Sequence, residues 1–186
     1  MRIISGKNKG KTIIPPLDKN TRPLRDIVKE AIFNLIEHSK KFDVLIPDAN
    51  ILDLFSGSGS FGLECISRGA QKVIFIENYS SVLKILNRNI LNIKGENIGH
   101  IIEKNCFDFF DQTTTFNYKF ELIFLDPPYK EKKINSIIEK IKERKILKEN
   151  GIIIIHRHKN DEVEITNKLN ILDQRIYGIS KIIFGN

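Results

Sequence analysis

The sequence predicts an α/β domain built on a doubly wound, mostly parallel β-sheet. Between residues 50 and 156, short runs rich in Ile, Leu, Val and Phe alternate with amphipathic stretches of helical period. This alternation is typical of strand–helix–strand units, in which helices cover both faces of a parallel sheet. The run at 151–156 has no polar face, as expected for a strand buried on both sides. The last two runs have no helix between them, so they predict an antiparallel hairpin at the C-terminal end.

The chain begins with a small β-hairpin and a helix. Strands at 2–5 and 11–14 flank a turn of Gly, Asn and Lys, and two consecutive prolines end the pair. A helix is expected over 24–38. Its apolar residues at helical spacing are Ile27, Val28, Ala31, Leu35 and Ile36.

The alternating region supplies the remaining elements in chain order. Strands are expected at 51–55, 72–76, 100–103, 120–125 and 151–156. Helices are expected at 61–68, 80–92 and 134–144. The chain closes with strands at 170–177 and 179–184, joined near Gly178. We therefore expect residues 1–20 to form a basic β-hairpin extension and residues 21–186 to form the α/β domain.

The net charge of +7 is concentrated near the N-terminus. Residues 1–30 hold eight Lys and Arg residues against three Asp and Glu residues. A basic segment ahead of a nearly balanced body favours a polyanionic partner, most often a nucleic acid. A solvated, lysine-biased surface is the alternative. The candidate nucleic-acid contacts in the hairpin are Arg2, Lys7, Lys9 and Lys11.

Composition excludes several classes of protein. Two cysteines in 186 residues cannot form a disulfide scaffold, and the start of the chain does not resemble a secretory leader. We therefore expect a cytoplasmic protein with free thiols, and a monomer. No apolar run reaches the roughly 18 residues of a membrane-spanning helix, so no membrane partner is expected. No group of Cys, His and acidic residues has metal-ligand spacing, so we expect no metal site.

A glycine-rich segment follows the first strand of the sheet. Residues 57–62, Gly-Ser-Gly-Ser-Phe-Gly, match the G-x-G-x-x-G pattern between a predicted strand and a predicted helix. Without side chains at Gly57 and Gly59, the backbone can approach a ligand closely. Glu77 lies at the end of the next strand, where a carboxylate can accept hydrogen bonds from both hydroxyls of a ribose. The pattern indicates a nucleoside-containing cofactor, and by itself fits both NAD and S-adenosylmethionine (SAM).

The acidic residue before the glycines favours SAM. A carboxylate at Asp53 would repel a pyrophosphate, whereas it suits the ammonium group of SAM, which carries no phosphate. The alternative is that Asp53 caps a backbone group and the glycines form only a tight turn. After the third strand, the side chain of Asn105 and the next backbone N–H, that of Cys106, could bind an adenine edge; an ordinary turn is the alternative. The candidate cofactor-binding residues are Asp53, Phe55, Gly57, Gly59, Glu77, Asn78, Asn105 and Cys106.

A second motif follows the fourth strand: Asp126, Pro127, Pro128 and Tyr129. Ligands of open α/β sheets bind outside the carboxyl ends of the strands. The Asp126 carboxylate and the Pro127 carbonyl can both accept hydrogen bonds from one NH₂ group, which frees the nitrogen lone pair for methyl transfer. The prolines stiffen the loop, and Tyr129 offers a flat face on which an extruded base can stack. The alternative is a rigid turn that ends the strand.

Other candidate residues fit ordinary structural roles equally well. His156 and His158 share one face of a strand end, but two imidazoles do not make a metal site. The run at 107–110 is expected to form core and a helix cap. The lysines that follow the second motif could meet phosphates or could form a solvated helix start; they are Lys130, Lys132 and Lys133.

Together these segments resemble the RsmD family of bacterial 16S rRNA (guanine-N2)-methyltransferases. The resemblance covers nearly the whole chain, and its most specific parts are the opening segment, 1–11, and the Thr-Arg-Pro segment with its helix, 21–34. The segments at 52–64, 67–70, 126–129 and 175–178 are also similar to the family. Leu24, Asn105 and His156 depart from the family pattern: Thr is common at the first position, Asp at the second and an acid at the third.

The resemblance implies a class I SAM-dependent methyltransferase fold and methylation of one guanine N2 in 16S rRNA. The rRNA would be met within the small ribosomal subunit or an assembly intermediate. By analogy, Thr21, Arg22 and Pro23 would lie over the cofactor or target pocket. Three alternatives remain: methylation of DNA adenine, methylation of a protein glutamine, and a non-catalytic RNA-binding factor for ribosome assembly. A nicotinamide oxidoreductase fits less well, because of Asp53 and the Asp126 motif.

Overall fold

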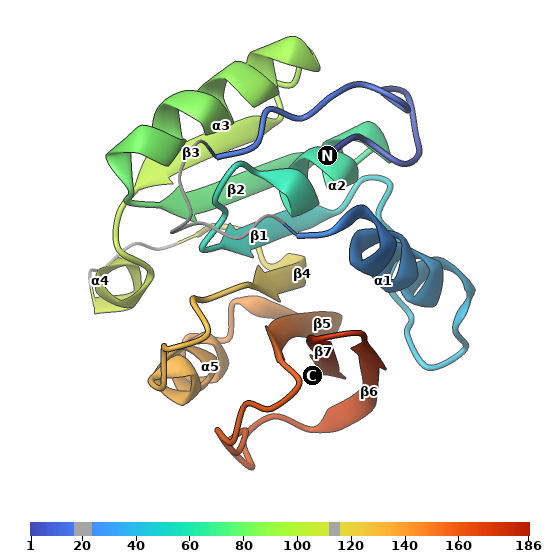
Figure 1. The fold of residues 1–186 in the computed structure, drawn as a ribbon. Helices are drawn as coiled ribbons and strands as arrows, with labels where there is room; N and C mark the ends of the chain where they lie inside the picture. The colour runs from blue at the N-terminus through green and yellow to red at the C-terminus, as the bar shows by residue number, and fades with distance from the viewer. Residues whose placement is uncertain (17–23, 112–115) are drawn as a thin grey trace.

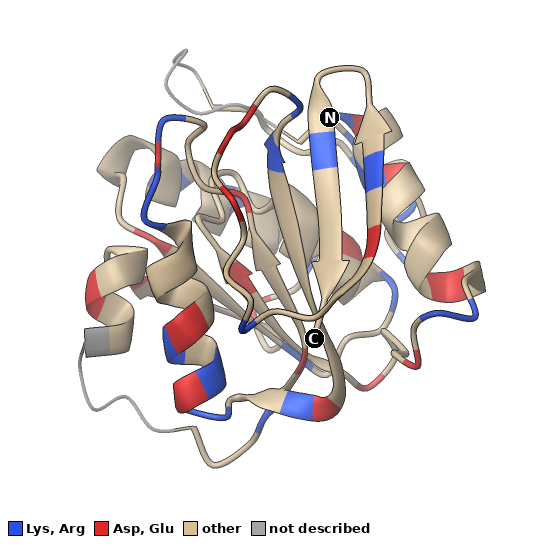
Figure 2. Cartoon of the chain, turned by 90° about the horizontal axis from the view of Figure 1, so that it is seen from below, with Lys and Arg blue, Asp and Glu red and all other residues tan. Residues whose placement is uncertain are grey.

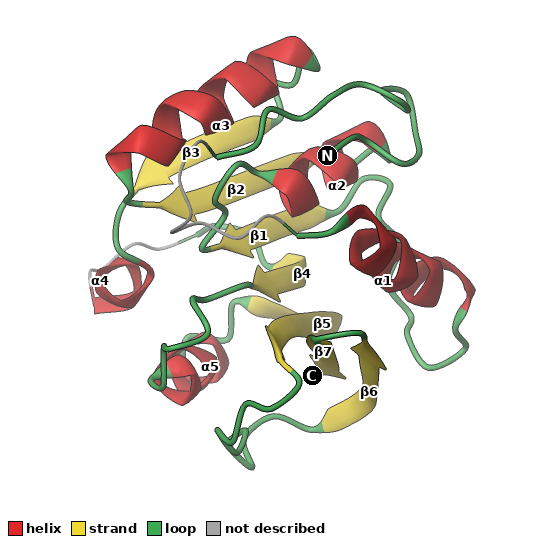
Figure 3. Cartoon of the chain, viewed as in Figure 1, coloured by secondary structure: helices red, strands yellow, loops and turns green. Residues whose placement is uncertain are grey.

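The computed structural model describes residues 1–16, 24–111 and 116–186. A seven-stranded sheet with the order β3-β2-β1-β4-β5-β7-β6 forms the centre (Figures 1 and 3). The strands are β1 (Asn50–Leu54), β2 (Lys72–Glu77), β3 (Gly99–Glu103), β4 (Phe120–Leu125), β5 (Leu147–His158), β6 (Ile171–Tyr177) and β7 (Ser180–Gly185). The helices are α1 (Asp26–His38), α2 (Ser60–Ser67), α3 (Ser80–Asn92), α4 (Cys106–Asp111) and α5 (Ile134–Glu143).

The sheet is parallel from β3 to β5 and antiparallel at its C-terminal edge. β1 pairs in parallel with β2 and with β4, and β4 pairs in parallel with β5. β7 is antiparallel both to β5 and to β6. The mostly parallel sheet with a C-terminal antiparallel hairpin is therefore confirmed. The strand order reverses between β1 and β4, which is where open α/β sheets bind their ligands.

Two apolar cores lie on opposite faces of the sheet. Because side chains alternate along a strand, Leu122 and Phe124 of β4 join the core beneath α1, α2 and α3, and Ile123 and Leu125 join the core beneath α4 and α5. Figure 1 shows the same division of the helices. All four side chains are at most 2% exposed, which explains why β4 reads as a continuous apolar run. Within the described ranges, no helix is both long and apolar enough to cross a bilayer.

The N-terminal segment is a hairpin with a single antiparallel bridge, between Arg2 and Thr12. It packs along α2 by a very close backbone approach. Gly6 has φ +78°, and a Cβ atom there would lie 1.9 Å from the carbonyl oxygen of Ser67 at the end of α2. Only glycine fits this position.

Buried polar side chains fasten the same segment to the sheet domain. The carboxylate of Glu64 on α2 accepts the N–H groups of Ile4 at 2.8 Å and Ser5 at 2.9 Å. The amide of Asn89 on α3 exchanges hydrogen bonds with the backbone of Ile14 and donates to the carbonyl of Ser58 in the glycine loop. Asn89 thereby links Ile14 of the N-terminal segment to the glycine loop.

The buried face of α1 includes Val28 and Ile36 as the spacing predicts, but it is shifted relative to the prediction. Ile27 is 64% exposed, whereas Lys29 is fully buried. The Lys29 ammonium donates to the carbonyl of Arg2 at 2.7 Å and lies 3.7 Å from the Glu64 carboxylate. These partners come from the N-terminal segment and α2, so they could not be read from the helix itself. Burial lowers the pKa of Lys29, although Glu64 opposes this.

Candidate active site

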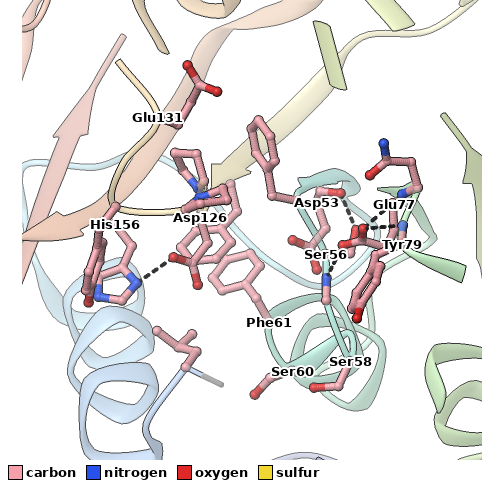
Figure 4. A pocket seen from close by; sticks show the side chains of 18 of the residues that line it. Asp53, Ser56, Ser58, Ser60, Phe61, Glu77, Tyr79, Asp126, Glu131 and His156 are labelled. Carbon is pink, nitrogen blue, oxygen red and sulfur yellow. Dashed lines mark hydrogen bonds and ion pairs between the residues drawn. The ribbon is translucent and has the colours of Figure 1, made fainter. Parts of the chain in front are cut away.

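A cavity of about 710 Å³ opens at the carboxyl ends of β1, β2, β4 and β5. Its lining combines the two sequence motifs with segments that neither motif contains (Figure 4). Carboxylates reach it from Asp53 in β1, Glu77 at the end of β2 and Asp126 after β4. Because parallel strands end at one edge of the sheet, side chains from distant parts of the sequence meet here.

The loop after β1 turns sharply enough to require special backbone angles. Phe55, Gly57 and Gly59 have φ values of +57°, +54° and +82°. A Cβ atom on Gly59 would lie 2.4 Å from Cδ1 of Leu86. The Ser56 hydroxyl donates to the Asp53 carbonyl at 2.6 Å and ties the loop back to its strand. The chain can therefore pass directly from β1 into α2 and leave open space above the loop.

The Glu77 carboxylate braces this loop from the neighbouring strand. It accepts the N–H of Gly57 at 2.8 Å through Oε2, and the N–H groups of Asn78 and Tyr79, both at 2.9 Å, through Oε1. A carboxylate oxygen can accept two hydrogen bonds, so Oε2 keeps the capacity for a ligand hydroxyl. The structure thus gives Glu77 a loop-bracing contact that the motif did not predict.

Asp53 is buried beneath the loop. Its side chain accepts the N–H of Gly62 in the first turn of α2 at 3.0 Å, so the capping contact considered from the sequence is present. Burial raises the pKa of the Asp53 carboxyl well above its usual range, and the nearby carboxylates of Asp126 and Glu77 also raise it. A cation bound in the cavity would stabilise all three carboxylates.

Aromatic side chains form another wall of the cavity. The rings of Phe55 and Phe107 meet edge to face at a centroid distance of 6.0 Å, and both line the cavity. Phe107 lies in the first turn of α4, a short helix absent from the elements expected from the sequence. Asn105, also at the cavity, accepts the N–H of Phe107 at 2.8 Å and thereby caps α4. Cys106 is buried, and its sulfur accepts the N–H of Phe55 at 3.2 Å.

The loop after β4 is held from β5. Asp126 lies at the cavity, and its Oδ1 is 2.7 Å from Nδ1 of His156 (Figure 4). The buried guanidinium of Arg157, the next residue of β5, donates to the carbonyls of Pro128 at 3.2 Å, Tyr129 at 3.1 Å and Glu131 at 2.8 Å. The two neighbouring residues of β5 thus fix the acidic side chain and the backbone of one loop.

Tyr129 stands beside two imidazole rings. Its ring meets His156 at a centroid distance of 5.9 Å and His158 at 5.2 Å, both in edge-to-face geometry. Tyr129 also lines the cavity, so these contacts hold its ring there. Both prolines of the motif also line the cavity.

The turn of the N-terminal hairpin lies away from the cavity. Lys7 donates its backbone N–H to the Ser67 carbonyl at the end of α2, whereas the cavity adjoins the start of that helix. The eight residues of α2 span about 12 Å. Arg2, Lys7 and Lys9 are exposed, and the Lys11 ammonium donates to the carbonyl of Asn92 at the end of α3.

The three residues Thr21, Arg22 and Pro23 lie outside the described residues. Leu24, directly after them, lines the cavity. Figure 2 shows basic and acidic residues interspersed in that view, without one large basic face.

The motifs did not predict every residue at the cavity. His156 and Phe107 contribute side chains, as does Tyr79, which is 39% exposed. The position of His156 at the carboxyl end of a parallel strand could have identified it as a cavity residue, because residues there face the ligand side of the sheet. Nothing in the local pattern singled out Phe107, since Phe109 and Phe110 beside it belong to the core.

Comparisons with known proteins agree with this geometry. Ribosomal RNA small subunit methyltransferase D of Haemophilus influenzae is 30% identical over 180 residues, which cover 96% of this chain and 90% of the relative. The protein of the same name from Escherichia coli K12 is 30% identical over 169 residues, covering 91% and 77%. A solved structure titled "Putative methyltransferase yhhF from Escherichia coli" superposes with a TM-score of 0.81 at 25% identity, covering 100% of this chain and 96% of the other.

The family comparison spans the whole chain. The family model described as Conserved hypothetical protein 95 matches residues 1–186. With the strand order, the glycine loop and the Asp126 motif in place, the resemblance drawn from the sequence is confirmed. The chain belongs to the Conserved hypothetical protein 95 family, the family of ribosomal RNA small subunit methyltransferase D.

Proposed function

We propose that this protein transfers a methyl group from SAM to the exocyclic N2 of one guanine in 16S rRNA. The observation that carries the proposal is the meeting of two motifs in one cavity. The glycine loop with Glu77 forms one side, and Asp126 with its two prolines forms the other. The relatives named as small-subunit rRNA methyltransferases support the substrate class. The guanine N2 target follows from the resemblance of the chain to its family.

The charge of the cavity fits SAM better than a dinucleotide. Four acidic residues line it, Asp53, Glu77, Asp126 and Glu131, and the N–H of Gly57 is bonded to Glu77 and therefore is not offered to a phosphate. SAM brings an ammonium and a sulfonium, and it supplies a methyl group on a positively charged sulfur. Asp53 would attract the cationic end, and Glu77 would accept a ribose hydroxyl through Oε2. Phe55 would form the apolar wall against the adenine.

The remaining cofactor candidates would act through the backbone or support the loops. Gly57 and Gly59 let the main chain approach the ligand, and Asn78 follows Glu77 at the rim. Asn105 would face the adenine edge. Cys106, whose sulfur holds the N–H of Phe55, would act through its backbone.

The loop after β4 would hold the methyl acceptor. An exocyclic amine is a poor nucleophile, because its lone pair is delocalised into the ring. The Asp126 carboxylate and the Pro127 carbonyl would accept its two N–H bonds and draw the nitrogen toward tetrahedral geometry. Pro128 would stiffen the loop, and Tyr129 would stack on the extruded base. The contribution of the loop is thus positioning and electrostatic stabilisation.

We further propose that exposed basic residues guide the RNA. Arg2, Lys7, Lys9 and Lys11 would contact phosphates, and Lys7 lies about one α2 length from the cavity, a distance that a folded rRNA can span. Thr21, Arg22 and Pro23 would approach the target nucleotide, as the resemblance implies. The substrate would be the small subunit or an assembly intermediate, met by a monomer in the cytoplasm.

Methyl transfer from labelled SAM tests the function. The purified protein is incubated with tritiated SAM and with 30S particles, naked 16S rRNA or 50S particles, all from a strain that lacks the modification. We expect label in 16S rRNA and none in 50S rRNA. Asp126→Ala should abolish transfer while leaving SAM binding largely intact. No label in any small-subunit RNA would contradict the proposal, and labelled adenine or glutamine would point to the alternative methyl acceptors.

A further inference from the structure

His156 forms a buried hydrogen-bonded chain with the acidic residue of the cavity. The side chain lies at the end of β5 and the residue is 7% exposed. Its Nδ1 lies 2.7 Å from Oδ1 of Asp126, and its Nε2 lies 2.8 Å from Oγ of Ser180 on β7. Figure 4 shows the imidazole directed at the Asp126 carboxylate. Both ring nitrogens therefore have a hydrogen-bonding partner, Asp126 for one and Ser180 for the other.

The Ser180 hydroxyl can fix the tautomer of the neutral imidazole. A hydroxyl can donate to Nε2, which leaves the ring proton on Nδ1, where it can be donated to Asp126. In the protonated ring both nitrogens donate, and Ser180 then accepts. In either state one carboxylate oxygen of Asp126 is held by the imidazole, and the other oxygen remains for a ligand in the cavity.

We propose that His156 is a positioning residue for methyl transfer: it orients the Asp126 carboxylate toward the target amine, and its protonation state sets the strength of that carboxylate as an acceptor. The inference rests on the proposed function. When the amine nitrogen attacks, its lone pair forms the N–C bond, and the electrons of the breaking C–S bond pass to sulfur. The nitrogen loses one proton to Asp126, which passes it to water as the product leaves.

A positive charge on the His156 imidazole opposes the attack of the amine nitrogen. Positive charge develops on the nitrogen during the attack, and an ionised Asp126 beside a neutral His156 stabilises it fully. When His156 is protonated, its positive charge offsets that of Asp126. Methyl transfer should therefore become faster as pH rises through the titration of His156.

Few titratable groups surround the ring in the part of the chain that the structure describes. Asp126 faces it from the end of β4, and Tyr129 faces it from the following loop. Arg157 is its neighbour on β5, and β7 contributes the neutral hydroxyl of Ser180. Burial disfavours the charged ring, but the charge and hydrogen bond of Asp126 outweigh this and raise the pKa of His156 above 6.5.

Two substitutions of His156 separate the effect of its hydrogen bond to Asp126 from the effect of its positive charge. In His156→Asn the amide nitrogen can take the place of Nδ1 and donate to Asp126, but it does not titrate. In His156→Gln the amide reaches toward the place of Nε2, so the contact with Asp126 is lost. His100→Asn, on the exposed surface of β3, is the matched control for loss of an imidazole.

Kinetics of the purified protein on 30S particles provide the first test. In the wild type and in His100→Asn, kcat should rise on the order of tenfold as His156 loses its proton. In His156→Asn, kcat should vary little over that pH range. In His156→Gln, kcat should fall on the order of tenfold to a hundredfold at every pH, with KM for SAM unchanged. If kcat of His156→Asn rose with pH as it does in the wild type, the inference would be overturned.

Proton-detected NMR of the imidazoles tests the same pair without any reaction. The chain has four histidines, and the resonance missing from His156→Asn identifies the ring. We expect its pKa to lie above 6.5 and to fall in Asp126→Asn. A titration unaffected by Asp126→Asn would refute the coupling. An inactive wild type with the expected titration would instead refute the proposed function alone, so the two failures are distinguishable.

Discussion

Arg157 is the buried side chain that holds the backbone of the loop after β4, so Arg157→Lys directly perturbs the geometry of that loop. The guanidinium is 1% exposed, pairs with the Asp161 carboxylate and donates to three carbonyls of the loop after β4. A lysine ammonium is a compact point charge, whereas the guanidinium is a planar fork with five donors. Lysine can therefore satisfy the carboxylate or part of the loop, but not both.

The contacts of Arg157 show how much stability Arg157→Lys should lose. A hydrogen bond to a charged group contributes about 1.5–3 kcal/mol, and the substitution removes at least two of them. Since the loop carbonyls can be rehydrated, we expect the free energy of unfolding to fall by about 3 kcal/mol. For a chain of this size each kcal/mol corresponds to roughly 2–4 °C in Tm, so Tm should fall by roughly 6–12 °C.

Arg157→Lys should slow the methyl-transfer step without weakening SAM binding. The glycine loop and Glu77 do not contact Arg157 in the described hydrogen bonds, so the Kd for SAM should stay within about twofold. A loop that shifts by about 1 Å misplaces Asp126, and such a displacement can lower kcat on the order of a hundredfold.

Calorimetry and single-turnover methyl transfer measure the two effects, with Asp161→Asn as the matched control. That variant removes the negative charge that pairs with Arg157 but leaves the three carbonyl contacts in place, so it should keep most of kcat. If Arg157→Lys retained wild-type kcat, or if Asp161→Asn lost as much, the role assigned to the carbonyl contacts would be wrong.

Three further predictions follow from other contacts. Glu64→Gln should lower the free energy of unfolding by about 3–5 kcal/mol in urea titrations, because it removes the charge facing buried Lys29 and places a donor against backbone N–H groups. Asp53→Asn should raise Tm at pH 8 and weaken SAM binding in calorimetry. Because burial raises the pKa of Asp53, the wild type loses stability as pH rises from the unfolded value near 4, so the Tm difference should vanish toward that pH. Lys7→Ala with Lys9→Ala should weaken rRNA binding, with the slope of log Kd against log salt reduced by up to about 2 and SAM affinity unchanged.

Most of the sheet could be predicted, because its signal is local. β2 and β4 each contain four consecutive apolar residues, and the parallel arrangement follows from the intervening helices. The location of the cavity could also be predicted, since the carboxyl ends of β1 and β4 meet where the strand order reverses. The glycine loop and the Asp126 motif were therefore placed correctly with respect to each other.

Contacts between distant segments could not be predicted. His156 lies 30 residues from Asp126, and their pairing depends on the register of β5 against β4. Burial of Lys29 depends on Glu64 and on a carbonyl of the N-terminal segment. The spacing of apolar residues shows which positions can face a core, but not which polar residues find partners there.

The same limit applies to the basic residues. Their number near the N-terminus predicted a nucleic-acid contact, but charge counting carries no information about position. The hairpin packs along α2 with its turn beside Ser67, at the opposite end of that helix from the cavity. Lys130, by contrast, lines the cavity.

The identity of the methylated nucleoside is the sharpest test of guanine N2 methylation by this protein. After reaction with labelled SAM, 16S rRNA from 30S particles is digested to nucleosides, separated by chromatography and identified by mass spectrometry, and the site is mapped on the intact RNA. We expect N2-methylguanosine at a single position, which Asp126→Ala fails to produce. Label in a different nucleoside, or label that persists in Asp126→Ala, would contradict it.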